Sequence, residues 1–226
     1  MSDVLELVAF DIETTGFAVE DKVTVVGFEF EMGTRVFLQV GGDQSIAEDE
    51  LETRVREASG TPVQLSVHDT ERDLLEAVGS FGGSRLADGD LLLVAYNGER
   101  WQSGFDLPFL RTRLASHDVD WPFGNVPYAD LMPVLNRRFN TAVVDGESVS
   151  DLVGVYETLV SGDASSIDPF VDSEEAVAAF ETGDYLELVL HNVADVSRTL
   201  ELGRLSQRYC SKSDFSLKSL TPTVEG

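Results

Sequence analysis

The sequence predicts an α/β fold in which a mixed central sheet is covered by helices on both faces. Near the amino end, three segments with strand character are separated only by short turns, which is typical of an antiparallel meander. Beyond them, helical patterns alternate with short apolar runs, and the chain then becomes mainly helical. Antiparallel strands followed by such an alternation are typical of a mixed sheet between two helical layers.

The three opening strands are expected to begin at Leu7, Lys22 and Arg35. The first is apolar on both faces, as in a central strand buried between two layers. The second and third are rich in β-branched and aromatic residues, which favour strands. Gly41 and Gly42 follow the third strand and are expected to end it.

The middle of the chain is expected to alternate between helices and strands. The predicted order is an exposed helix or irregular insertion at 45–59, an edge strand at 63–67, a helix at 70–81, a buried strand at 91–96, a helix after 105, a last strand at 126–131 and a short helix at 132–139. Thr70 can cap its helix with Asp73 three residues on, and Gly82 should stop that helix. Pro108 suits a first helical turn.

The carboxyl-terminal third is expected to be helical. The predicted helices are 150–160, 173–182 and 184–209, with a polar loop at 161–172. Asp184 and Glu187 have the spacing of a capping box for the last helix. Residues 1–209 are therefore expected to form a single domain, and residues 210–226, which have little apolar content, a loosely held tail.

Composition favours a folded protein in a reducing compartment. Of the 226 residues, 42% are hydrophobic and 9% aromatic, which is typical of a globular chain with a sizeable core. The longest apolar run, 91–96, is too short to span a membrane, and the amino end lacks the pattern of a secretory signal. Cys210 is the single cysteine, so no internal disulfide forms. We therefore expect a cytoplasmic protein with no membrane association.

The charge is strongly negative. Asp and Glu number 41 against 16 Lys and Arg, a formal net charge of −25, and the acids are spread along the chain. The apolar content argues against disorder. We expect adaptation to a cytosol of multimolar salt, as in a halophilic organism, where self-repulsion is screened. Counterion release is suppressed in such salt, so the negative charge does not exclude a nucleic-acid partner.

Two acids at the end of the first strand indicate a metal site. Asp11 and Glu13 are two residues apart, so their side chains share one face of the strand. Adjacent carboxylates at a buried strand end repel each other and cost desolvation, and a divalent cation such as Mg²⁺ or Mn²⁺ removes both penalties. Gly16 can adopt positive φ in the turn that follows. The alternative is a solvated acidic turn.

Further acids fall where they could join this pair. Asp106 lies just beyond the carboxyl end of a buried strand, where sites form in α/β sheets, although it could also be a plain helix cap. His191 and Asp195 lie one turn apart on the last long helix. The alternative for them is a solvated stripe that includes Arg198.

Taken together, these segments resemble the DEDD superfamily of 3′→5′ exonucleases, which have a ribonuclease H-like fold. Asp-Ile-Glu-Thr-Thr-Gly at 11–16 resembles the first motif. Asn97-Gly, followed after a longer loop with Arg100 and Trp101 by Phe105-Asp-Leu-Pro-Phe-Leu, resembles the second. Asp195-Val with Thr199-Leu is similar to the third motif of the proofreading domains of family B DNA polymerases. That group has tyrosine at the position of His191, whereas the histidine subclass places its histidine five residues before the aspartate.

The resemblance implies a two-metal 3′→5′ exonuclease acting on the 3′ end of a single-stranded nucleic acid, with DNA favoured over RNA. It implies that the metal ligands are Asp11, Glu13, Asp106 and Asp195, which bind two Mg²⁺ or Mn²⁺ ions. His191 would act as general base. The residues expected to hold the terminal nucleotide are Thr14, Thr15, Asn97 and Phe105.

Two other interpretations compete with this one. The first is a non-catalytic ribonuclease H-like module that binds nucleic acid or protein. The second is an unrelated acidic α/β domain in which the motifs occur by chance. Retention of all four acids favours the enzyme, because a scaffold does not need clustered carboxylates. A protein partner in replication or repair is compatible with the exonuclease and with the non-catalytic module.

Overall fold

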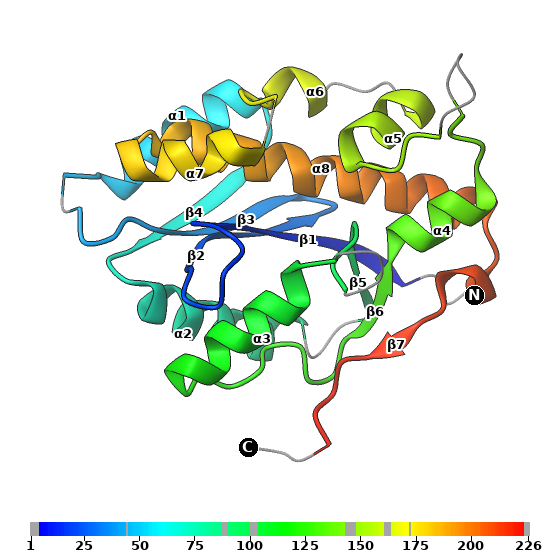
Figure 1. Cartoon of the computed structure of the whole chain (residues 1–226), viewed down its shortest axis with the longest axis horizontal. Helices are drawn as coiled ribbons and strands as arrows, with labels where there is room; N and C mark the ends of the chain where they lie inside the picture. Colours follow the sequence, from blue (N-terminus) through cyan, green and yellow to red (C-terminus); the bar gives the residue numbers. More distant parts are fainter. Residues whose placement is uncertain are drawn as a thin grey trace.

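The computed structural model contains a seven-stranded sheet in the order β4-β3-β2-β1-β5-β6-β7 (Figure 1). It describes residues 5–43, 45–86, 90–99, 104–142, 148–160, 164–171 and 173–223. The strands are β1 (Glu6–Thr14), β2 (Val23–Phe30), β3 (Gly33–Gln39), β4 (Val63–His68), β5 (Leu91–Ala95), β6 (Pro127–Asp130) and β7 (Lys218–Ser219).

The strand directions make the sheet mixed. β2 runs antiparallel to both β1 and β3, as the predicted meander requires. β5 is parallel to β1, β6 to β5, and β4 to β3. The α/β class and the mixed sheet are therefore confirmed. β7 pairs antiparallel with β6 and extends the sheet beyond the strand that was expected to be the last.

Helices cover both faces of the sheet (Figure 1). The helices are α1 (Glu48–Ser59), α2 (Glu71–Phe81), α3 (Asp106–His117), α4 (Leu131–Arg138), α5 (Leu152–Leu159), α6 (Ala164–Ile167), α7 (Ser173–Thr182) and α8 (Tyr185–Tyr209). α2 and α3 share one apolar core with the sheet. α8 lies on the other face, where α1 and α7 join it at one end and α4 and α5 at the other.

Side chains of β1 alternate between these two cores. Phe10 and Ile12 pack on the face of α2 and α3, whereas Ala9 packs on the face of α8. Because successive strand residues point to opposite faces, Asp11 and Glu13 are directed toward α8. The central strand therefore presents its two acids to the longest helix.

α8 is the element around which that second face is built. It has 25 residues, so its length is about 37 Å. It packs on β1, β2 and β5 and is contacted by α1, α4, α5, α6 and α7. Among the described helices, none, α8 included, combines the length and apolar character needed to cross a membrane.

Two helix ends differ from the predictions. α2 ends at Phe81 with Gly82 as its C-cap, but Gly82 keeps right-handed helical dihedral angles, so the chain continues as a π-helical turn, η1 (Gly82–Leu86), that buries Leu86. Asp184 forms no side-chain cap on α8. Its Oδ2 instead accepts a hydrogen bond of 2.6 Å from the hydroxyl of Thr182. The predicted capping box at Asp184 and Glu187 is therefore wrong.

Of the two alternatives for residues 45–59, the helix is confirmed as α1. The stretch 161–172, expected to be a loop throughout, contains the short helix α6. Arg100 and Trp101, in the loop of the second motif, lie outside the described residues.

After α8, the chain returns to the edge of the sheet. Ser211 and Asp214 form a capping box on a short 3₁₀ helix, η2 (Lys212–Phe215). Phe215 and Leu220 are buried, and the indole Nε1 of Trp121 donates a hydrogen bond of 3.0 Å to the carbonyl of Leu220. Residues 211–220 are thus held by main-chain and apolar contacts, where low apolar content had predicted a loosely held tail.

Candidate metal centre

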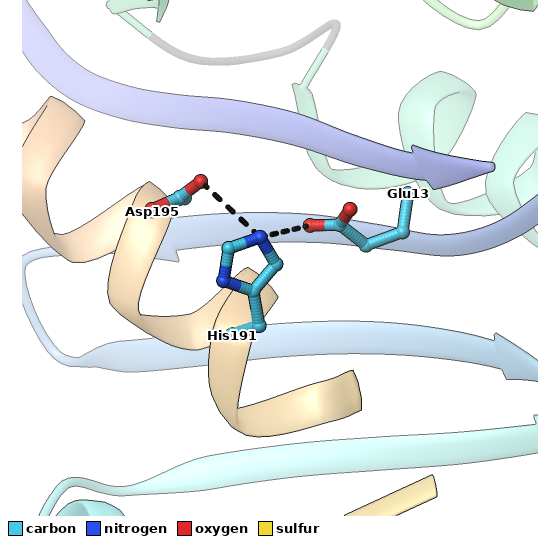
Figure 2. A group of neighbouring side chains, drawn as sticks. All are labelled: Glu13, His191 and Asp195. Atoms are coloured by element: carbon cyan, nitrogen blue, oxygen red, sulfur yellow. Dashed lines mark ion pairs between the residues drawn. The ribbon is translucent and has the colours of Figure 1, made fainter. Parts of the chain in front are cut away.

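β1 and α8 bring three of the predicted site residues together. Glu13 comes from the end of β1, and His191 and Asp195 lie one turn apart on α8, all directed into the same space (Figure 2). The Nε2 atom of His191 lies 3.9 Å from Oε1 of Glu13 and 3.9 Å from Oδ2 of Asp195. One potential ligand atom from each of the three lies within 4.8 Å of the others.

Asp11 is tied to the same helix by Asn192. The amide Nδ2 of Asn192 donates a hydrogen bond of 3.0 Å to Oδ2 of Asp11. Asn192 is fully buried, and its Oδ1 has no hydrogen-bond partner in the described part of the chain. The amide orientation is therefore determined by its contact with Asp11.

Asp106 joins the group from the first turn of α3, the helix that packs on the face of the sheet opposite α8. Burial raises the pKa of Asp106 well above its usual value, and the charges of Glu13, Asp130 and Asp195 raise it further. Burial likewise raises the pKa of Asp11, with added repulsion from Glu13, Asp106 and Asp195. The four predicted acids thus feel one another's charge in a buried setting. A divalent cation would stabilise their ionised forms.

His191 and Glu13 each change the pKa of the other. Burial raises the pKa of Glu13 to about 7, although the charge of His191 counteracts it. Burial lowers the pKa of His191, but the hydrogen bond with Asp168 and the charges of Glu13 and Asp195 outweigh it and raise the pKa to about 9. In the protein without metal, His191 is therefore the positive partner of these carboxylates at neutral pH. A bound cation would take the place of that proton.

Asp168 holds the other side of the His191 ring, a contact that sequence reasoning missed. Its Oδ1 lies 2.8 Å from Nδ1 of His191, and its Oδ2 accepts a hydrogen bond of 2.6 Å from Nη1 of Arg198. The same Nη1 donates to Oδ1 of Asp195 at 2.5 Å. Burial raises the pKa of Asp168, but His191 and Arg198 lower it more, so it is ionised and can only accept. Nδ1 of His191 therefore carries a hydrogen, and Nε2 faces the metal centre.

Asp130 shapes the loop before Asp106 and was also missed. It ends β6 and accepts main-chain hydrogen bonds of 3.0 Å from Asn97, 3.2 Å from Glu99 and 3.1 Å from Met132. The signal was present in the sequence, because Asp130 lies at the carboxyl end of a predicted strand, and sites form at that edge of α/β sheets. No comparable signal marked Asp168, which lies in a polar stretch 23 residues before His191.

Of the four residues predicted to hold a nucleotide, Thr14 and Thr15 follow Glu13 directly, but their hydroxyls are already engaged. Thr14 donates to the carbonyl of Gly16 at 2.7 Å. The Thr15 hydroxyl donates to Oδ1 of Asp21 at 3.1 Å and accepts from the Lys22 amide at 3.0 Å. Both hydroxyls thus stabilise the turn between β1 and β2.

The other two of these residues flank the loop before α3. Asn97 adopts a left-handed conformation with φ of 59°, and its Oδ1 is buried without a hydrogen-bond partner among the described residues. The ring of Phe105 packs against Phe17 and Phe109, with centroid distances of 5.1 and 4.6 Å. Phe17 is 76% exposed, so this aromatic pair reaches the surface next to Asp106.

The donor set fits a divalent cation. Carboxylate oxygens suit Mg²⁺ and Mn²⁺, and the imidazole nitrogen suits Mn²⁺ and the later first-row metals. Comparison with known proteins adds no assignment: no protein-family model matches the sequence, and no curated protein matches it.

Proposed function

We propose that this chain is a metal-dependent 3′→5′ exonuclease that hydrolyses terminal phosphodiester bonds of single-stranded nucleic acid, with DNA favoured over RNA. The observation that carries the proposal is the meeting of acids from three distant segments. Asp11 and Glu13 on β1, Asp106 on α3 and Asp195 on α8 gather at one end of the sheet, where burial raises the pKa of Asp11 and of Asp106 and the charges of Glu13 and Asp195 raise both further. Their order matches the three motifs that resemble the DEDD superfamily.

The arrangement of the sheet supports the same proposal. Three antiparallel strands, β1 to β3, are followed by the parallel additions β5 and β6, with helices on both faces. This agrees with the ribonuclease H-like fold that the resemblance implies, and we include that finer fold in the proposal. The acids lie at the carboxyl ends of the parallel strands β1 and β5, where sites form in α/β sheets.

In the proposed enzyme, two Mg²⁺ or Mn²⁺ ions would be held by Asp11, Glu13, Asp106 and Asp195. Such ions supply an acidified water and neutralise charge on the phosphate and the leaving oxygen. The chain itself keeps the acids in place: Asn192 orients Asp11, and Arg198 orients Asp195.

His191 offers its Nε2 between Glu13 and Asp195. From that position it could accept a proton, as the resemblance implies, or bind a cation directly. Phe105 directly precedes Asp106, packs on Phe17 and donates its main-chain N–H to the carbonyl of Asn97. Asn97 and the aromatic pair Phe17–Phe105 remain our proposed contacts for the terminal nucleotide. Thr14 and Thr15 would contribute through the turn that they stabilise.

The test is an assay with single strands of DNA and RNA, labelled at either end, in molar KCl with Mn²⁺ or Mg²⁺. We expect mononucleotides to be released from the 3′ end, and chelation to stop the reaction. Asp11→Asn with Glu13→Gln should reduce activity to the level without metal. A matched control is Glu57→Gln with Glu187→Gln, which removes two exposed charges from α1 and α8 and should leave activity unchanged.

The melting temperature separates the enzyme from the non-catalytic alternative. A bound cation should raise it by mass action in the wild type and in the control, but not in the Asp11/Glu13 variant. Metal-dependent stabilisation without strand cleavage would favour a binding module. Release from the 5′ end would contradict the proposed polarity.

A further inference from the structure

The imidazole of His191 is placed like a ligand and not like a free base. The residue is only 8% exposed, and its ring is enclosed on α8 beside Phe170. Nε2 has no hydrogen-bond partner within the described residues. It points between Glu13 and Asp195, at 3.9 Å from an oxygen of each (Figure 2).

These separations suit a shared cation. Ligand bonds to a first-row divalent ion are about 2.0–2.2 Å long, so two ligand atoms of one ion lie no more than about 4.4 Å apart. Both contacts of Nε2 fall inside that limit. Since one ligand atom from each of the three side chains lies within 4.8 Å of the others, the space between them is close to the size that one ion with nitrogen and oxygen ligands needs.

Asp168 supplies the second feature of a histidine ligand. A histidine bound to a metal nearly always donates its other ring N–H to a carboxylate or carbonyl, which fixes the ring and its tautomer. Here Nδ1 of His191 donates to Asp168 at 2.8 Å, and Asp168 is itself held by Arg198, which is 2% exposed. Arg198 also donates to Asp195. The buried guanidinium of Arg198 therefore orients the Asp195 carboxylate directly and the His191 ring through Asp168.

We propose that Glu13, His191 and Asp195 form a single mixed nitrogen–oxygen metal site, with Asp168 as the carboxylate that orients the imidazole, and that this site prefers Mn²⁺ or a later first-row ion to Mg²⁺. The inference rests on the metal-binding part of the proposed function, and it replaces the general-base role that the sequence predicted for His191. Asp11 and Asp106 remain all-oxygen ligands for the neighbouring position.

The preference follows from the donor atoms. Mg²⁺ is bound almost entirely by oxygen, whereas imidazole favours metals that rise in affinity from Mn²⁺ through Co²⁺ toward Zn²⁺. A nitrogen in the site therefore adds affinity for those ions and little for Mg²⁺. This would account for a histidine at the position where the polymerase proofreading domains that the sequence resembles have a tyrosine.

The test is electron spin-echo spectroscopy of the protein loaded with Mn²⁺, which detects a ¹⁴N nucleus bound to the ion. The chain has three histidines. We expect ¹⁴N modulation in the wild type, its loss in His191→Gln, and its retention in His68→Gln and His117→Gln. Glutamine keeps the size of the side chain and can still bond to Asp168. Circular dichroism would check that each variant is folded.

Titration calorimetry provides the affinity. His191→Gln should weaken Mn²⁺ binding at least about tenfold and change Mg²⁺ binding much less. Asp168→Asn should weaken Mn²⁺ binding by about 10–100-fold while the ¹⁴N signal persists at saturation.

The outcomes separate this inference from the proposed function. Mn²⁺ that binds without ¹⁴N modulation, and that is lost in the Asp11/Glu13 variant, would overturn the histidine ligand and leave the exonuclease proposal intact. Full ¹⁴N modulation without strand cleavage would keep the metal site and overturn the enzyme. Failure of any divalent ion to bind would overturn both.

Discussion

Glu71, on the opposite face of the sheet from α8, illustrates how one residue can tie several elements together. Its side chain is buried, and it accepts hydrogen bonds from the Val23 amide at 2.9 Å and from Nε and Nη2 of Arg113 at 2.8 and 2.6 Å. Nε2 of His117 lies 2.9 Å from it. Burial alone would raise the pKa of Glu71, but the hydrogen bonds from Arg113, Val23 and His117 lower it below its usual value. By contrast, the pKa of Asp11 in the metal centre stays raised, because the hydrogen bond from the neutral amide of Asn192 does not offset burial.

The lowered pKa of Glu71 predicts that the free energy of unfolding depends on pH. Because the folded pKa of Glu71 is depressed, its contribution is present above the unfolded pKa of about 4.3 and is lost as pH falls through the folded value. Glu71→Gln should cost about 3 kcal/mol at pH 7, since Arg113 loses a buried partner. The difference from wild type should narrow below about pH 4. Urea unfolding at several pH values would measure it.

Glu76→Gln is the matched control for this prediction, because it lies on the same helix in an exposed pair with Arg72. Its effect should stay below about 1 kcal/mol at every pH. A Glu71 variant as stable as the Glu76 variant at pH 7 would contradict the account.

At the scale of elements, the close approach of α8 to β2 positions the metal-centre residues that α8 carries, His191 and Asp195. A Cβ atom on Gly27 would lie 2.0 Å from Oδ1 of Asn192 and 3.2 Å from a methyl group of Val196. Glycine at this position therefore allows the helix to come close enough for Asn192 to reach Asp11. The geometry of the site depends on a residue that carries no side chain.

We predict that Gly27→Ala both destabilises the fold and weakens metal binding. Overpacking at a tight contact costs about 1–3 kcal/mol, which corresponds to a melting temperature several degrees lower. The increase in melting temperature on adding Mn²⁺ should also shrink, because Asn192 is pushed away from Asp11. Gly83→Ala is the control, since a Cβ there meets nothing within 4 Å. Equal melting curves for the two variants would contradict the packing argument.

The elements also explain how far the sequence could predict this molecule. The positions of β1 and β5 followed from their apolar runs, and that of α8 from its helical spacing. Spacing also put Asp11 and Glu13 on one face of β1, but their convergence with Asp195 was expected only from the resemblance to the exonuclease motifs. The pairing of β7 did not, because a two-residue strand carries no periodic signal. Asp168 could not be predicted either. Its role depends on how the stretch after α5 folds back over α8, and that is a tertiary contact.

For the whole molecule, the dominant feature is the net charge of −25. Exposed acids are carried on the outer helices, for example Glu48, Asp49 and Glu50 in the first turn of α1. Four other acids, Asp11, Glu13, Asp106 and Asp195, are gathered at the metal centre, where burial raises the pKa of each. Surface repulsion and the metal centre thus depend on different ions: monovalent salt screens the surface, whereas a divalent cation would neutralise the site.

These two dependences can be measured separately, and they give the last prediction. The screening length is about 10 Å in 0.1 M salt and about 3 Å in 1 M salt, so self-repulsion should weaken steeply over this range. We expect the melting temperature, followed by circular dichroism, to rise between 0.1 and 3 M KCl in the wild type. The Asp11→Asn with Glu13→Gln variant should show the same rise, because the exposed acids that cause it are unchanged. A low concentration of Mn²⁺ should add a further increase in the wild type alone. A melting temperature that does not change with KCl would contradict the expected adaptation to high salt, and a Mn²⁺ effect of equal size in both proteins would place the cation on the acidic surface instead of at Glu13.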